Sequence, residues 1–149
     1  MENFTWKIKT FEQLSAKELH AILKARIDVF VVEQTCPYPE VDGYDPRAIH
    51  LWAENKEEVI AYCRIFEPGV KYPESSIGRV LTDQKFRNLN LGKTLMRFAI
   101  NSIEARFRVT TVRISAQDYL LPFYEGFGFS STGNSYLEDD IPHSEMLLR

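Results

Sequence analysis

The stretch from residue 77 to residue 115 constrains the fold more than any other. Its pattern predicts a strand over Ile77–Thr82, a helix over Leu91–Phe107 and a strand over Val109–Ser115. One face of the expected helix is apolar and carries Leu91, Leu95, Met96, Ala99, Ile100, Ile103 and Phe107. A helical connection of this length lets the second strand run parallel to the first. We therefore expect a sheet that contains a parallel pair and has a helix packed on one face.

The remaining elements are expected on both sides of this unit. Ser15-Ala-Lys-Glu18 matches a capping box, so a helix should begin there. The expected elements are an edge strand over Thr5–Lys9, a helix over Ala16–Glu33, a loop over Gln34–Ala48, a hairpin of His50–Glu54 and Val59–Phe66, a short helix over Asp118–Tyr124, and strands over Phe129–Leu137 and His143–Leu148. Together they predict one α+β domain over residues 1–149, with a mixed central sheet and helices on both faces.

Composition argues against several classes of protein. The net charge of −3 does not favour nucleic acid as the main partner. The run Val29-Phe30-Val31-Val32 is too short to span a membrane, and the first residues lack the apolar core of a secretion signal. Cys36 and Cys63 show no zinc-site spacing and suit a reducing compartment. We expect a cytoplasmic protein with no metal site and no membrane or nucleic-acid partner.

The loop before the second long helix is a candidate anion site. It contains Arg87, Asn88, Asn90 and Gly92, and it places backbone N–H groups at the positive end of a helix. A phosphate or pyrophosphate suits such a loop. Gly-Lys-Thr at 92–94 lacks the upstream glycine of a Walker loop, and a plain helix start capped by asparagine is the alternative.

A second motif lies in residues 115–129, and the two motifs together resemble the GNAT superfamily of acyl-CoA N-acyltransferases. Arg87-Asn-Leu-Asn90-Leu-Gly92 is similar to its R-x-x-G-x-G/A pattern. Gln117, Leu120, Phe123 and Tyr124 are similar to its N-x-x-A-x-x-F-Y pattern. The pieces that resemble the ElaA-like branch are Arg26-Ile-Asp-Val-Phe-Val-Val-Glu-Gln, Pro37-Tyr38, Asp42-Gly43 and Ile141-Pro142-His143.

The chain departs from the family patterns at three positions. Asn90 replaces a glycine, Gln117 an asparagine and Leu120 an alanine. Asparagine tolerates left-handed backbone angles better than most residues, so Asn90 can keep the loop's shape. Its side chain would crowd a bound pyrophosphate, which leaves the affinity for the cofactor open.

The resemblance implies how acetyl-CoA is bound. The two parallel strands are expected to splay apart, so that the backbone of Val80, Leu81 and Thr82 bonds the pantetheine arm. The loop amides would hold the pyrophosphate, and these belong to Asn88, Leu89, Asn90, Leu91, Gly92 and Lys93. Arg87 and Gln117 are further candidate cofactor contacts; the alternatives are a solvated surface arginine and a strand-end cap.

The resemblance also implies the chemistry. Tyr124 matches the tyrosine that donates a proton to the departing thiolate, whereas from the residues alone it would be a packing residue. The base that deprotonates the acceptor amine stays open among His50, His143 and Glu33, with Glu40, Asp42 and Glu145 acting directly or through water. The acidic residues Glu33, Glu40, Asp42 and Asp45 either attract a cationic acceptor or are simply solvated.

The expected function is transfer of an acetyl group from acetyl-CoA to a small-molecule or peptide amine. The alternative is a catalytically silent acyl-CoA-binding module, and a structural partner protein that binds no coenzyme A is a third interpretation. The oligomeric state stays open: members of the family often dimerise, so a homodimer is one alternative, and the sequence fixes no interface.

Overall fold

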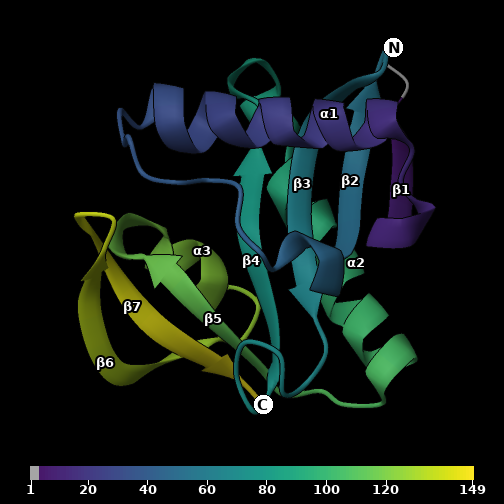
Figure 1. The fold of residues 1–149 in the computed structure, drawn as a ribbon. Coiled ribbons are helices and arrows are strands. Elements are labelled where there is room, and N and C mark those ends of the chain that lie inside the picture. Colours follow the sequence, from purple (N-terminus) through teal and green to yellow (C-terminus); the bar gives the residue numbers. More distant parts are fainter. Residues whose placement is uncertain (1–3) are drawn as a thin grey trace.

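The computed structural model describes residues 4–149 and has a seven-stranded sheet at its centre, in the order β1-β2-β3-β4-β5-β7-β6 (Figure 1). The strands are β1 (Thr5–Thr10), β2 (Ile49–Asn55), β3 (Glu58–Phe66), β4 (Ser75–Thr82), β5 (Val112–Gln117), β6 (Ser130–Glu138) and β7 (Ile141–Leu148). Among the strands of residues 4–149, only the β4–β5 pair is parallel. The predicted mixed sheet with one parallel crossover is therefore confirmed.

Two long helices cover opposite faces of the sheet. The capping box predicted at Ser15 is present, and α1 (Ala16–Arg26) continues as a π-helical segment, η2 (Ile27–Glu33). The helix thus has the predicted extent, but its last turns are π-helical. On the other face, α2 spans Leu91–Phe107, as expected. No helix within residues 4–149 is both long and apolar enough to cross a membrane.

Strand β3 shows how the sequence creates two layers. Alternate side chains of a strand point to opposite faces. Tyr62 packs with Ile22 of α1, whereas Cys63 and Ile65 pack with Leu95 of α2. Because both faces of β3 are buried, the strand is apolar almost throughout.

The short elements differ from the prediction in detail. A 3-10 turn, η3 (Asp45–Arg47), interrupts the expected loop, and β4 begins two residues earlier than expected, at Ser75. The predicted short helix over 118–124 is a 3-10 turn, η5 (Asp118–Leu120), followed by α3 (Leu121–Glu125). Sequence patterns locate element ends only to within a few residues.

The parallel strands separate soon after they pair. Within the described residues, β4 and β5 are in register only at Ser75–Val112 and Ser76–Arg113. Beyond this point β4 stays paired with β3, and β5 stays paired with β7. The edge of β4 that faces β5 is therefore unpaired along Val80, Leu81 and Thr82, and the two halves of the sheet diverge around an opening (Figure 1).

Candidate active site

A cavity of about 140 Å³, here called the splay cavity, lies where β4 and β5 diverge. Its walls come from β3, β4, β5, α3, β7, the segment after η2 and the β6–β7 turn. The residues that line it include four of the predicted site residues, namely Val80, Gln117, Tyr124 and His143. Segments distant in the sequence thus bring these side chains to one place.

Tyr124 reaches the splay cavity from α3. The helix has Pro122 in its first turn, where the missing N–H costs nothing. The tyrosine is only 5% exposed, and its ring packs edge-on against Phe123 and Phe129. Burial raises the pKa of the phenol above its usual value. The hydroxyl is therefore protonated at neutral pH, as a proton donor must be.

His143 enters from β7, which pairs with β5 at Gln117. Its Nδ1 lies 2.7 Å from the carbonyl oxygen of Ile141. A carbonyl only accepts hydrogen bonds, so Nδ1 carries the proton and Nε2 keeps a lone pair when the ring is neutral. The ring stacks on Tyr136, and Nε2 lies 3.4 Å from Oε2 of Glu138. His143 is thus oriented to accept a proton beside a carboxylate that would stabilise the resulting cation.

Gln117 ends β5 at the edge of the cavity. Its side-chain amide lies 3.4 Å from that of Gln34, which follows η2. This contact joins two segments that are 83 residues apart. Gln117 therefore helps to close one side of the splay cavity.

The predicted anion loop consists of η4 (Gln84–Leu89), Asn90 and the first turn of α2. Asn90 has φ 56° and ψ 28°, the left-handed conformation that the sequence suggested it would tolerate. Among the described residues no side chain caps α2. The first amides of a helix lack intrahelical acceptors, so this end can bind an anion.

Gly92 allows the start of α2 to approach α3 closely. A Cβ atom at this position would lie 3.3 Å from Cζ of Phe123 and 3.8 Å from Cγ2 of Thr82. The glycine therefore keeps the anion loop near the end of β4. This places the loop and the splay cavity on neighbouring parts of the molecule.

Arg87 and Glu33 form an ion pair in place of their separately predicted roles. Arg87 Nη2 lies 2.7 Å from Glu33 Oε2, and Arg87 Nε donates to the carbonyl of Thr82 at 3.1 Å. Within residues 4–149, Glu33 is not one of the residues that line the splay cavity. The structure thus argues against Glu33 as the base and places Arg87 beside the anion loop.

His50 is not brought to the splay cavity. It is fully buried between β1 and β3, where Nε2 donates to the carbonyl of Asp45 and Nδ1 accepts from the hydroxyl of Tyr62. Burial lowers its pKa, and the Asp45 carbonyl only partly offsets this effect. With both ring nitrogens engaged in the core, His50 has a structural role rather than the catalytic role expected as one alternative.

The acidic residues of the long loop are also not free to attract a cation. Arg26 donates to Glu40 at 2.9 Å and to Asp45 at 2.7 Å. Further pairs join Arg64 to Asp42 and Asp45, and Arg79 to Glu40 and Asp42. Three arginines therefore neutralise three carboxylates in what we call the arginine network.

Sequence reasoning missed this arginine network, although it left a signal. Arg26 follows Ile22 at helical spacing, so it falls on the buried face of α1. Arg64 alternates with Tyr62 and Phe66 in an apolar strand. Buried arginines require carboxylate partners, and the acidic loop was the available source.

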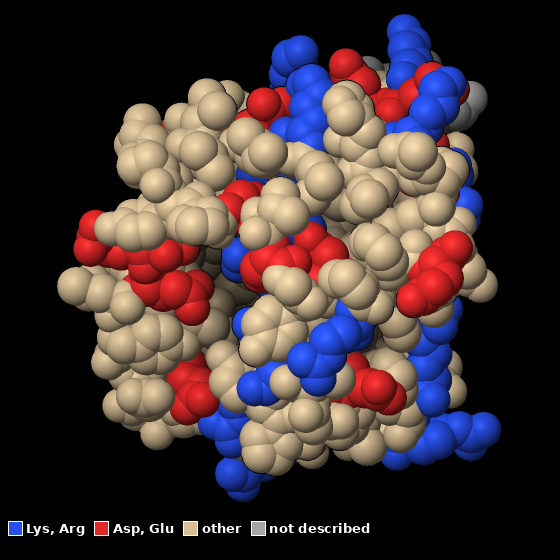
Figure 2. All heavy atoms as spheres, viewed as in Figure 1, with Lys and Arg blue, Asp and Glu red and all other residues tan. Residues whose placement is uncertain are grey.

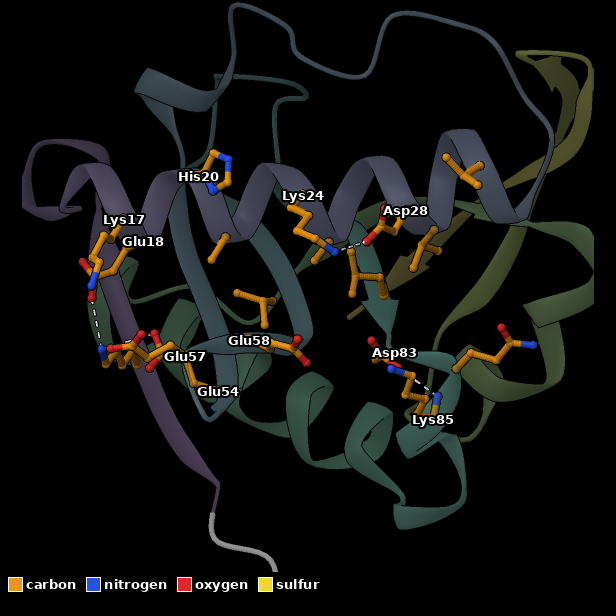
Figure 3. Close-up of a pocket in the computed structure, with 18 of the residues that line it drawn as sticks. Lys17, Glu18, His20, Lys24, Asp28, Glu54, Glu57, Glu58, Asp83 and Lys85 are labelled. Carbon is orange, nitrogen blue, oxygen red and sulfur yellow. Dashed lines mark hydrogen bonds and ion pairs between the residues drawn. The ribbon is translucent and has the colours of Figure 1, made fainter.

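A second and larger hollow was also not predicted. It has a volume of about 940 Å³ and lies between α1, the β2–β3 hairpin and the start of η4 (Figure 3). We call it the α1 groove. Lys24 and Asp28 form an ion pair at 2.7 Å on its rim, and Ala25, Val59 and Leu81 contribute apolar surface.

Comparisons with known proteins agree with this geometry. A family model described as an acetyltransferase (GNAT) domain matches residues 13–149. The chain is similar to protein ElaA of Escherichia coli, with 34% identity over 95% of this chain and 94% of the relative. The crystal structure of that ElaA has a TM-score of 0.91. An acyl-CoA N-acyltransferase from Pseudomonas aeruginosa also has a TM-score of 0.91, with 40% identity over 97% of this chain and 99% of that one.

Proposed function

Because the chain belongs to the ElaA-like branch of the GNAT acyltransferase family, which uses acyl-CoA, we propose that it transfers an acetyl group from acetyl-CoA to an amine. The amine attacks directly while both substrates are bound. The observation that carries this proposal is the convergence of Tyr124 and His143 on the splay cavity. One can donate a proton and the other can accept one.

The cosubstrate would bridge the anion loop and the splay cavity. The amides of residues 88–93 would bind its pyrophosphate at the uncapped start of α2. Arg87 would add a charge-assisted contact after it leaves Glu33. The unpaired edge of Val80, Leu81 and Thr82 would bond the pantetheine arm as an added strand does.

The reaction then needs three proton transfers. A free alkyl amine has a pKa of about 10.4, so it must lose a proton before it attacks. His143 Nε2 would take this proton, and the amine nitrogen would bond to the thioester carbon. As the C–S bond breaks, the Tyr124 hydroxyl would protonate the sulfur, because a thiol leaves more readily than a bare thiolate. The Tyr124 oxygen would then take up the second proton, which the nitrogen loses as the amide forms. The small volume of the cavity favours acetyl over long acyl groups.

Thiol release from acetyl-CoA, measured over a broad panel of amines, tests the proposal. Tyr124→Phe should reduce turnover by about 10²-fold or more, with the affinity for coenzyme A nearly unchanged. Tyr119→Phe is the matched control, because Tyr119 lies on the neighbouring η5 turn and is 69% exposed. An unchanged rate in Tyr124→Phe would remove this tyrosine from the mechanism.

A catalytically silent acyl-CoA-binding module is the second candidate function. Asn90 favours it, since an exposed side chain stands in the anion loop where the family pattern has glycine. This candidate predicts calorimetric binding of coenzyme A with no turnover of any amine.

A further inference from the structure

The two walls of the splay cavity carry opposite charges, which acyl transfer by itself does not require. The wall formed by β3, β4 and the loop between them presents Arg64, Lys71 and Arg79. The opposite wall is the end of β6 and the turn after it, with Glu138 and Asp139. Figure 2 shows acidic atoms on one side of a central hollow, and both basic and acidic atoms on the other side. A ligand with charges at both ends would match these walls.

The basic wall has one cation in excess of the arginine network. Three arginines and three carboxylates balance there, and Lys71 is additional. Among residues 4–149, no ion pair or hydrogen bond joins the Lys71 ammonium to a carboxylate. The ammonium lies over the ring of Tyr44 at 4.1 Å and near that of Phe66 at 6.0 Å. Lys71 is thus held over two aromatic rings at the rim of the cavity, with no carboxylate in direct contact among residues 4–149.

Arg64 supplies a second unfilled donor on the same wall. Its residue surface is 2% exposed, and both of its Nη atoms bond to Asp42 or Asp45. Its Nε, however, has no acceptor among the described residues. The guanidinium lies 5.2 Å from the centre of the Phe66 ring, the ring that Lys71 also approaches. Buried donors normally have partners, so Arg64 is the one buried side chain among the described residues that keeps a donor unused.

The acidic wall is the side on which an amine would react. Glu138 lies beside His143 Nε2, the atom proposed to accept the proton of the amine. A protonated amine is attracted to Glu138 and arrives next to the base. The opposite end of the same molecule would then face Lys71 and Arg64.

We propose that the acceptor is a small amino carboxylate, such as an α-amino acid. Its carboxylate binds at Lys71 and Arg64, and its ammonium binds at Glu138 and His143. The ammonium gives one proton to His143 Nε2, and its nitrogen bonds to the acetyl carbon. The departing sulfur receives the proton of Tyr124, and the Tyr124 oxygen takes up the second proton that the nitrogen loses as the amide forms. This inference rests on the acyl transfer proposed above and specifies its second substrate.

Matched acceptors provide the test. Thiol release from acetyl-CoA is measured with several α-amino acids and with the C-terminal amide of each one. We expect kcat/KM to be at least about tenfold higher for the acids, because a charge-assisted contact is lost in the amides. The amine of an amide is the weaker base and is deprotonated more readily, so this comparison is biased against the expected result.

Substitutions assign the effect to the basic wall. Lys71→Met should raise KM for the acids by at least about tenfold, leave kcat nearly unchanged and not affect the amides. Lys71→Arg should retain the preference for acids. Lys56→Met is the matched control, because Lys56 lies in the exposed β2–β3 turn. Equal use of acids and amides, or an equal effect of Lys71→Met on both, would overturn the proposal.

Two further outcomes separate the possible failures. If no amine releases thiol, the proposed acyl transfer is wrong, and the subsite is then tested by NMR titration of the coenzyme A complex with N-acetylglycine and N-acetylglycinamide. Binding of the acid alone, lost in Lys71→Met, supports the carboxylate subsite, and its absence overturns it. If a carboxylate is preferred on the acyl group instead, with succinyl-CoA used better than acetyl-CoA, the assignment to the acceptor is wrong.

Discussion

The α1 groove and the splay cavity are built from different kinds of contact. The groove is formed by α1, one hairpin and the start of η4, and an ion pair on its rim, Lys24–Asp28, joins residues one helical turn apart. The splay cavity joins distant segments through contacts such as Gln34 with Gln117 and Cys36 with the carbonyl of Asp139. It is also the smaller of the two, at about 140 Å³ against 940 Å³.

This difference teaches that volume alone is a poor guide to chemistry. The groove has solvated charges on its rim, where ion pairs contribute little to stability. The splay cavity has buried groups whose partners and orientation are fixed. Removing one partner there leaves a buried polar or charged group unpaired, which reduces stability strongly. Substitutions in the cavity and its walls should therefore have large effects, and substitutions in the groove small ones.

The largest effect is expected from Asp45→Asn in the arginine network. Asp45 is buried and accepts from Arg26 at 2.7 Å and from Arg64 at 2.9 Å. Loss of its charge leaves buried arginines underpaired, which should reduce the free energy of unfolding by about 3–5 kcal/mol. Urea denaturation measures this change. A loss below about 1 kcal/mol would mean that a substitution in the arginine network affects stability no more than a substitution on the surface.

His143→Gln should act on the reaction rather than on folding. Turnover should fall by about 10²-fold or more, because the proposed base is lost, while coenzyme A still binds. His20→Gln is the matched control, since His20 is exposed and lines the α1 groove. Equal losses in the two variants would contradict the distinction between the cavity and the groove.

Acid titration should expose the contribution of Asp42 to stability. Burial alone would raise the pKa of this carboxyl, but the hydrogen bonds and charge of Arg64 outweigh that effect and lower it to about 2. A lowered pKa stabilises the folded state above the unfolded value of about 4, and this stability is lost as pH falls from about 4 towards 2. The side chain is 29% exposed, so screening limits the loss to about 1 kcal/mol.

The measurement for Asp42 is the free energy of unfolding as a function of pH. Asp42→Asn should reduce the slope between about pH 4 and pH 2, to which Glu18 and Glu74 also contribute because their pKa values are lowered to about 2. Asp28→Asn, in the solvated pair on the groove, should leave most of the slope. The same slope in all three proteins would rule out Asp42 as its source.

Asn90→Ala should have an effect of similar size through the backbone. Alanine disfavours the left-handed conformation found at φ 56°, at a cost of about 1 kcal/mol, and glycine does not. We expect thermal unfolding to show a less stable Asn90→Ala protein, and calorimetry to show that Asn90→Gly binds coenzyme A at least as tightly as the wild type. Tighter binding by Asn90→Ala than by Asn90→Gly would contradict this account of the loop.

The smallest effect is expected from Lys24→Met in the α1 groove. The Lys24–Asp28 side chains are 68% and 55% exposed, and such pairs contribute about 0.3–0.5 kcal/mol. Stability should change by no more than this amount, and acetyl transfer should not change. A clear loss of transfer in Lys24→Met would show that the groove takes part in the reaction.

The local part of the fold could be predicted from the sequence. The capping box at Ser15, the helix over Leu91–Phe107 and the hairpin after His50 depend on neighbouring residues, and the structure confirms them. The anion loop and Tyr124 were found because short motifs specify them. Their proposed roles remain predictions.

The rest of the fold and of the candidate site could not be predicted, because it depends on contacts between residues that are far apart in the sequence. His50 and His143 looked equivalent in the sequence, since each lies at or near a strand start. Only the packing distinguishes them: both strands have a neighbour on each side, but His50 is enclosed in the core whereas His143 lines the splay cavity. In the same way, the sequence left the carboxylates of the long loop either to attract a cation or to be solvated. Their arginine partners come from α1, β3 and β4, which are distant in the sequence.

The short register between β4 and β5 has a mechanical consequence. Within the sheet, the three-strand unit β5-β7-β6 is paired to the four-strand unit β1–β4 at two positions of the described residues, Ser75–Val112 and Ser76–Arg113. A molecule bound along the unpaired edge of β4 would hold these two units of the sheet together. Amide protons of β5 should then exchange with solvent more slowly when such a molecule is bound, because binding stabilises the least paired part of the sheet against local opening.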